Sequence, residues 1–207
     1  MLVILDRQHG DKGGTWDTGA AFGGHLAAKP DGATYWPNPP IFEVDLTTGY
    51  LAHARRHLEA AGHRVQMIDA GPYRERQQLA NDSARAYRGL ALYVAAHINA
   101  GGGRYGLALY DARSKMGAVA AGDVADALKE GLPELTKARA TAATASGWTA
   151  RALGTIRGIW SGPPNVCGIC FEPGFIDSPH HRSMWTEAGL RRVGRSLADG
   201  LQRYAQR

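Results

Sequence analysis

The chain has 207 residues, which suits one α/β domain and leaves little room for a second. Hydrophobic residues make up 44% and charged residues 21%, as in ordinary globular proteins, and two cysteines are too few for a disulfide framework. The formal net charge of +5 favours a polyanionic partner, either nucleic acid or an anionic cell envelope. The C-terminal arginines are scattered along a helical pattern, however, and this argues against a nucleic-acid patch.

The N-terminus, MLVILDRQHG, has neither a basic region nor a long apolar segment, so we expect no signal peptide. No apolar run approaches the roughly 18 residues that are needed to span a bilayer. We therefore expect no insertion into a membrane.

Apolar runs of strand length alternate with helical patterns along the chain. Strands are expected at 2–5, 64–68, 90–95, 107–110 and 166–171, and helices at 42–61, 74–88, 116–128 and 186–204. The Gly-rich stretch 10–32 is expected to form a long loop, and the Ala- and Thr-rich residues 133–150 favour neither structure. This alternation predicts one α/β domain over 1–207, with a twisted, mostly parallel sheet flanked by helices on both faces and no separate wall-binding domain.

Several apolar strands lead into side chains that can bind a metal or transfer a proton. These side chains are Asp6, His9, His97, Asn99 and Glu172. Because the carboxyl ends of parallel strands meet at one edge of a sheet, we expect them to gather there. Glu43, in the first turn of the helix after the long loop, would point toward the same edge.

Two histidines and one carboxylate, with a water as the fourth ligand, are typical of a catalytic zinc site. We therefore expect His9, Glu43 and His97 to bind Zn²⁺, which can lower the pKa of a bound water toward about 7. A second carboxylate must take the proton of that water and pass it to the leaving group, and Glu172 is the candidate. Asp6 is expected to orient an imidazole. Each residue alone has an ordinary structural explanation, so the prediction depends on their coincidence at equivalent strand ends.

Other histidines also have spacing that can chelate a metal. His53 and His57 lie four residues apart on one predicted helix, but no glutamate stands in the HExxH position. His57 is 14 residues from Glu43, or about 21 Å along a helix, and cannot share a metal with it. We expect both histidines on the surface or at the rim of the site.

Two further pairs of residues have a chemical and a structural interpretation. Cys167 and Cys170 form a single CxxC, a weak zinc signal, and in a strand their thiols should point to opposite faces. We expect two buried strand cysteines. His180 and His181 follow FEPGFIDSP and are expected on a solvated loop near the mouth of the site, although a substrate role stays open.

Four blocks occur in chain order: ILDRQHG, FEVDLTTGYLAHARRHLEAAGHRV, VAAHINAGGG and FEPGFID. Together they resemble the zinc-dependent N-acetylmuramoyl-L-alanine amidases of the amidase_3 type, a family found in cell-separation enzymes and phage lysins. The resemblance runs from Leu2 to Tyr204. The segment after the first histidine departs from the family pattern, because an extra DKGGTW precedes Asp17, and this changes the expected shape of the mouth.

The resemblance implies zinc on His9, Glu43 and His97, with Glu172 as the general acid and base. It also implies that Asn99 lies beside the metal-binding histidine and shapes the site. The side chains expected to line the cleft are Phe175 and Ile176.

The implied reaction is hydrolysis of the amide bond between N-acetylmuramic acid and L-alanine in bacterial peptidoglycan. A chain of this size without an export signal or wall-binding domain resembles a compact phage or prophage endolysin. Such a protein is made in the cytoplasm, reaches the cell wall after release by another factor, and is expected to be a monomer that binds no nucleic acid.

Two alternatives remain open from the residues themselves. One is a zinc carboxypeptidase or another peptidase on a related sheet. The other is a basic module that binds the cell envelope or nucleic acid and keeps only a relict site. The presence of all four key residues argues against the binding module.

Overall fold

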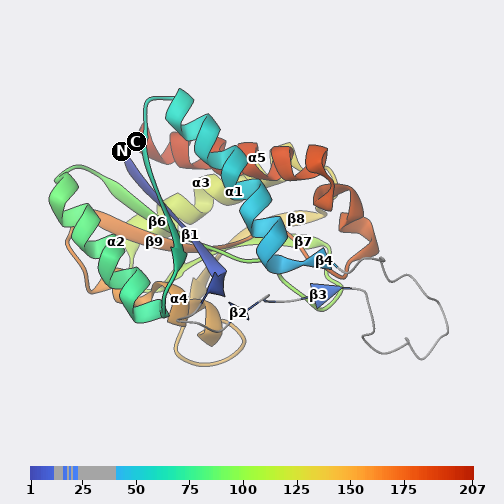
Figure 1. Ribbon diagram of the computed structural model, residues 1–207, viewed down its shortest axis with the longest axis horizontal. Helices are drawn as coiled ribbons and strands as arrows, with labels where there is room; N and C mark the ends of the chain where they lie inside the picture. The colour runs from blue at the N-terminus through green and yellow to red at the C-terminus, as the bar shows by residue number, and fades with distance from the viewer. Residues whose placement is uncertain (12–15, 18, 20, 23–40) are drawn as a thin grey trace.

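A β-sheet of seven strands runs through the molecule (Figure 1). Its strands are β1 (Leu2–Asp11), β2 (Trp16–Asp17), β5 (Arg64–Ala70), β6 (Ala91–Ala96), β7 (Tyr105–Asp111), β8 (Lys137–Ala143) and β9 (Val166–Glu172). They are ordered β2-β1-β6-β9-β7-β8, and β5 also pairs with β1. Strands β5, β1, β6 and β9 run parallel, whereas β7 is antiparallel to β9 and parallel to β8. The predicted mostly parallel sheet is thereby confirmed.

This computed structural model describes residues 1–11, 16–17, 19, 21–22 and 41–207. A small second sheet pairs β3 (Ala21–Phe22) with β4 (Ile41–Phe42). Most of the loop predicted over 10–32, and much of the departure from the family pattern after His9, lies outside the described residues.

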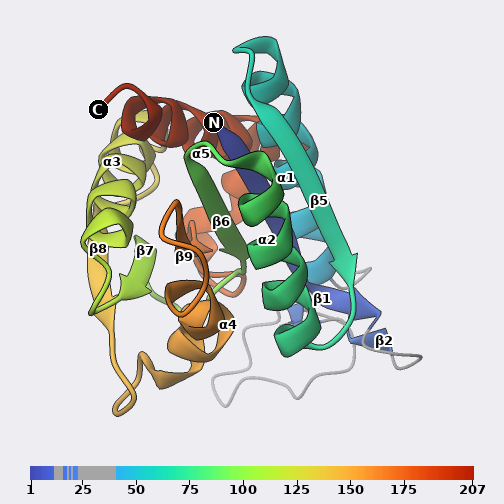
Figure 2. The ribbon, with the colours of Figure 1, turned by 90° about the vertical axis from the view of Figure 1, so that its left-hand side faces the viewer.

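Helices cover both faces of the sheet, as predicted (Figure 2). The helices are α1 (Glu43–Ala60), α2 (Tyr73–Tyr87), α3 (Lys115–Gly131), α4 (Ala150–Trp160), α5 (Glu187–Ala205) and a short 3-10 helix, η1 (Pro179–Trp185). One apolar layer joins the sheet to α1, α3 and α5, and a second layer joins it to α2 and α4. Within the described ranges, no helix has the length and apolar character to cross a bilayer.

The strands at the centre of the sheet are the ones that the sequence marks most clearly. Every residue of β6 is buried, and β9 is buried up to Phe171, because parallel strands are covered on both faces and read as continuous apolar runs. Strand β8 lies at the sheet edge and exposes several side chains. It therefore has no apolar run, which is why residues 133–150 favour no structure in the sequence.

Strand β1 is longer than its apolar run. It continues to Asp11, and a buried polar network holds Asp6 and Gln8, the first inward-facing polar side chains beyond Leu5. Arg76 of α2 forms an ion pair with Asp6 at 2.6 Å, and Tyr93 also donates a hydrogen bond to this carboxylate. Gln8 donates to the Tyr93 hydroxyl at 3.0 Å. Asp6 and Gln8 thus face α2.

The two cysteines are free and buried on opposite faces of β9. Cys167 packs in the layer with α1, α3 and α5, and Cys170 packs in the layer with α2 and α4. This arrangement confirms the prediction from strand alternation.

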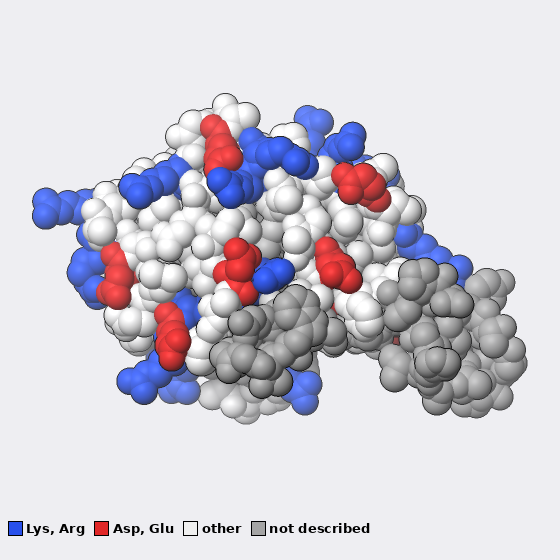
Figure 3. All heavy atoms as spheres, in the orientation of Figure 1, with Lys and Arg blue, Asp and Glu red and all other residues white. Residues whose placement is uncertain are grey.

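Charged side chains of both signs are interleaved on the face shown in Figure 3. Ion pairs involving the C-terminal arginines include Arg191–Glu187, Arg192–Glu134, Arg195–Asp199, Arg203–Glu130 and Arg207–Asp123. On this face the basic residues are therefore distributed among acidic ones, as expected for scattered charge.

His181 is fully buried in η1, which corrects the expectation of a solvated loop for this residue, while His180 is exposed. The Nδ1 atom of His181 accepts a hydrogen bond from the backbone N–H of Phe175 at 2.9 Å. Burial lowers the pKa of His181 to about 4. The folded protein therefore holds this imidazole in its neutral form, since a protonated ring cannot accept that hydrogen bond.

We predict that acidification destabilises the protein through His181. The unfolded chain takes up a proton near the ordinary histidine pKa of about 6.5, whereas the folded chain does so only near pH 4. Between pH 7 and pH 5, the free energy of unfolding of the wild type should fall by about 2 kcal/mol more than that of His181→Gln. Urea denaturation at both pH values measures this, with His180→Gln as the control that keeps the wild-type decrease. Equal decreases in the wild type and His181→Gln would contradict the prediction.

Helices α1 and α5 cross closely at Gly194. A Cβ atom there would overlap the carbonyl oxygen of Tyr50 and lie 2.7 Å from the Cβ of His53. We predict that Gly194→Ala lowers the free energy of unfolding by about 1–3 kcal/mol, because the helices must move apart. Gly122→Ala in α3 is the control, since its Cβ would meet no atom within 4 Å. It should be neutral or stabilising by up to about 1 kcal/mol, and similar losses for both variants would argue against this packing.

Candidate metal centre

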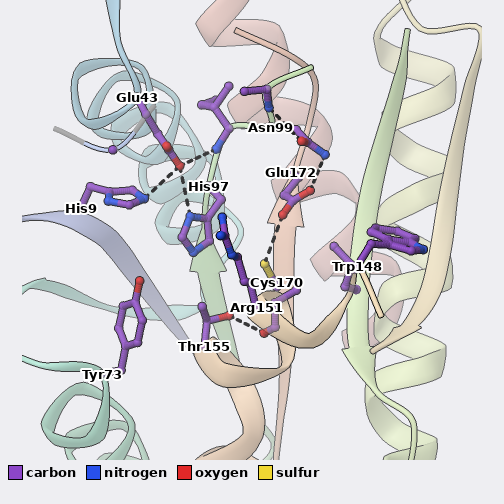
Figure 4. Close-up of a pocket in the computed structure, with 15 residues that line it drawn as sticks. His9, Glu43, Tyr73, His97, Asn99, Trp148, Arg151, Thr155, Cys170 and Glu172 are labelled. Carbon is purple, nitrogen blue, oxygen red and sulfur yellow. Dashed lines mark hydrogen bonds and ion pairs between the residues drawn. The ribbon is translucent and has the colours of Figure 1, made fainter. Parts of the chain in front are cut away.

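Three side chains from separate elements meet at one edge of the sheet (Figure 4). His9 comes from β1, Glu43 opens α1, and His97 follows β6. The Nε2 atom of His9 lies 3.3 Å from Oε1 of Glu43, and Nδ1 of His97 lies 3.1 Å from the same oxygen. Potential ligand atoms of all three residues lie within 4.8 Å of one another. The structure thus brings together the trio that the sequence singles out.

Backbone contacts hold this trio in place. The N–H of Ile98 donates to Oε1 of Glu43 at 2.8 Å, which ties the start of α1 to the end of β6. The N–H of His97 donates to the carbonyl oxygen of Phe171 in β9 at 2.9 Å. The hydroxyl of Tyr50, about two turns further along α1, donates to the carbonyl oxygen of His97 at 3.2 Å. His97 is therefore fixed from two sides.

The arrangement of donors fits a zinc ion. Ligand atoms about 2.0–2.1 Å from a tetrahedral zinc are separated by roughly 3.3 Å, close to the 3.3 Å and 3.1 Å found around Glu43. The Nε2 atom of His97 is buried without a hydrogen-bond partner in the described part of the chain. This is the ring nitrogen that does not face Glu43, since Nδ1 is the atom that lies 3.1 Å from Oε1.

Glu43 supplies a buried negative charge, since only 3% of the residue is exposed. Burial opposes ionisation, but the hydrogen bonds with His9 and His97 outweigh it and lower the pKa of Glu43 to about 2. The carboxylate is therefore ionised at neutral pH. Two imidazoles and one carboxylate form an N/O ligand set with the charge that a divalent cation needs.

Glu172 ends β9 and faces the same pocket. Its Oε2 atom accepts a hydrogen bond from Nδ2 of Asn99 at 2.8 Å, and its Oε1 atom lies 4.0 Å from the Cys170 sulfur. Burial raises the pKa of Glu172, and the negative charge of Glu43 acts in the same direction, against the opposing effects of His97 and Asn99. A carboxyl group with a raised pKa is suited to exchanging protons near neutrality.

The pocket has a volume of about 900 Å³. It is lined by His9, Gly19, Glu43, Tyr73, His97, Ile98, Asn99, Ala100, Leu109, Trp148, Arg151, Ala152, Thr155, Cys170 and Glu172. The sequence does not indicate Tyr73, Trp148, Arg151 or Thr155. The last three lie in or just beyond the stretch where no pattern distinguishes strand from helix.

Three predicted site residues lie elsewhere. The side chain of Asp6 faces α2 and contacts Arg76 and Tyr93 instead of an imidazole. Phe175 and Ile176 are only 4% and 2% exposed, and they do not line the pocket formed by the described residues. They lie behind it, because the N–H of Ile176 donates to the carbonyl oxygen of Asn99 at 2.9 Å and draws this segment inward.

His53 is not at the surface, which corrects the sequence prediction. It is 7% exposed, and its Nε2 atom lies 3.0 Å from Oε1 of Glu187 at the start of α5. His57 is partly exposed. Neither residue lines the pocket that contains Glu43, as the distance argument predicts.

No protein-family model and no curated protein matches the sequence. Solved structures do match its fold. Cwp6 from Clostridium difficile has a TM-score of 0.70 at 19% identity, over 98% of this chain and 29% of Cwp6. The N-acetylmuramoyl-L-alanine amidase AmiC2 of Nostoc punctiforme has a TM-score of 0.69 at 18% identity, over 100% of this chain and 98% of AmiC2.

The catalytic domain of the CD27L endolysin, which targets Clostridia difficile, has a TM-score of 0.61 at 16% identity. That match covers 98% of this chain and 96% of the CD27L domain. The present chain thus spans less than a third of Cwp6 but almost all of the AmiC2 and CD27L structures. It has the fold of the N-acetylmuramoyl-L-alanine amidase catalytic domains.

Proposed function

We propose that this protein is a zinc-dependent hydrolase that cleaves the amide bond between N-acetylmuramic acid and L-alanine in bacterial peptidoglycan. The observation that carries the proposal is the convergence of His9, Glu43, His97 and Glu172 on one pocket. This pocket lies in a fold shared with AmiC2, which is named for that activity. The four blocks of sequence that resemble the amidases supply the same four residues.

His9, Glu43 and His97 would hold the zinc. When bound there, zinc supplies a Lewis acid that polarises the scissile carbonyl and makes a water more acidic. The buried charge of Glu43 favours retention of the cation, and its contact with the N–H of Ile98 keeps the carboxylate oriented.

Glu172 would transfer the protons. It accepts one from the attacking water and then donates it to the nitrogen of the departing alanine, so no free amide anion is formed. The hydrogen bond from Asn99 to Oε2 restrains the rotation of this carboxyl group. Because burial raises the pKa of Glu172, the group can hold the proton between the two steps.

We further propose that the protein acts as a phage or prophage endolysin on the wall of its host. The support is the match to the catalytic domain of the CD27L endolysin over 96% of that domain. Its action as a monomer stays a prediction, which light scattering would test.

We predict that chelation abolishes digestion of purified peptidoglycan and that added Zn²⁺ restores it. The products should carry new L-alanine amino groups on the stem peptides, which amino-group labelling and mass spectrometry detect. Release of free C-terminal amino acids instead would indicate a carboxypeptidase. A folded protein that binds no metal and digests nothing would favour the binding module.

We predict that Glu172→Gln lowers kcat by at least about 100-fold while zinc is retained, because the proton carrier is lost and the ligands are untouched. Elemental analysis and the amino-group assay measure the two effects. Glu43→Gln should instead lose zinc, while His57→Ala should keep both zinc and activity. Digestion at the wild-type rate by Glu172→Gln would show that another group transfers the proton.

A further inference from the structure

One cationic side chain enters the pocket without a partner among the described residues. Arg151 lines the pocket together with His97 and Glu172, and Figure 4 shows its guanidinium group pointing into it from the start of α4. Within the described part of the chain, this guanidinium makes no hydrogen bond or ion pair. It presents five N–H donors in a planar fork, a geometry that matches a carboxylate.

Two other arginines near the sheet have carboxylate partners. Arg76 pairs with Asp6 at 2.6 Å, and Arg113 pairs with Asp111 at 2.6 Å. These arginines have structural roles that explain their positions. Among the residues that the structure describes, Arg151 has no such partner, and unlike the other unpaired arginines it lines the pocket beside His97 and Glu172.

Helix stability does not explain Arg151 either. It is the second residue of α4, and the first turn of this helix contains no acidic residue. A cation at this end is disfavoured by the helix dipole, which instead attracts an anion. The dipole and the guanidinium therefore add to the same positive field over this part of the pocket.

The turn before α4 is built to hold this wall of the pocket. The N–H of Thr144 donates to Oγ1 of Thr149 at 3.1 Å, and the hydroxyl of Thr144 donates to the carbonyl oxygen of Ser146 at 3.0 Å. Trp148 lies between these anchors, lines the pocket and is 67% exposed. An exposed aromatic ring thus lines another part of the same pocket.

We propose that Arg151 binds a free carboxylate of the stem peptide and makes the enzyme prefer acidic over amidated peptidoglycan. This inference rests on the proposed function. In that substrate the carboxyl group of the muramic acid is consumed in the scissile amide, so the carboxylates lie on the peptide side of the bond. A carboxylate paired with an arginine in a bidentate manner forms one of the stronger hydrogen-bonded contacts, whereas a neutral amide has no charge to offer.

The kinetic test compares one disaccharide-peptide with free carboxyl groups and the same compound with these groups amidated. For the wild type, kcat/KM should be about tenfold higher for the free acid, mainly through a lower KM. In Arg151→Ala this preference should disappear, and Arg151→Lys should keep part of it. Arg157→Ala removes the same charge from the same helix outside the pocket, and it should keep the wild-type preference.

An unchanged preference in Arg151→Ala would overturn the inference. This includes the case in which kcat falls equally for both compounds, because Arg151 would then stabilise the reaction itself rather than select a carboxylate.

A binding measurement separates failure of the inference from failure of the proposed function. Calorimetric titration of the free stem peptide into Glu172→Gln, with and without Arg151→Ala, needs no turnover. The free-acid peptide should bind about tenfold more weakly once Arg151 is removed. The affinity of the amidated peptide should be the same with and without Arg151. If the free-acid peptide bound equally well with and without Arg151, the carboxylate site would be overturned even where amidase activity is found. Loss of affinity without any amidase activity would keep the site and reject the reaction.

Discussion

A buried ion pair between Asp6 and Arg76 lets β1 run on past its apolar residues, and this extension carries His9 into the site. The apolar run stops at Leu5, yet the strand continues to Asp11 because Arg76 compensates the charge of Asp6 and also donates to the carbonyl oxygen of Arg7. Removing one partner of such a pair typically costs about 3–5 kcal/mol, since the other charge remains buried. Strand alternation then directs Asp6 toward α2 and His9 toward α1, where Glu43 lies.

Glu43 plays the corresponding role on the other side of the sheet. Its carboxylate contacts β1 through His9 and the segment after β6 through His97 and Ile98. A buried carboxylate with these contacts stays ionised, so the fold concentrates negative charge where a cation can bind. The same contacts define the relative position of α1 and the sheet, which means that the candidate metal centre is also a packing contact.

The sequence predicted the parts of the fold whose residues are buried on one face or on both. Strands β6 and β9 are continuous apolar runs, and α1 and α5 have a clear helical period, so their positions agree with the structure within a few residues. Strand β8 was not predicted, because an edge strand with exposed side chains has no apolar signal. The Asp6 network was not predicted either, since Arg76 lies 70 residues away in sequence.

The same reasoning explains which site residues could be predicted. His9, His97 and Glu172 follow or end strands with strong apolar patterns, and Glu43 starts a well-marked helix. Arg151 and Trp148 stand near a turn between an edge strand and a short helix, where only the folded backbone shows that they face the pocket. Phe175 and Ile176 were expected to line the cleft, but they are buried behind it. Apolar residues after the end of a strand suit the interior as well as a cleft, so the sequence does not distinguish the two positions.

The positions of the two cysteines have a consequence for where the chain can fold. Cys167 and Cys170 are buried on opposite faces of one strand, so they cannot bond to each other without dismantling the sheet. No other cysteine is present in the sequence. Once the chain has folded, the two thiols therefore stay apart in reducing and oxidising surroundings alike, and the folded structure needs neither condition to keep its covalent form.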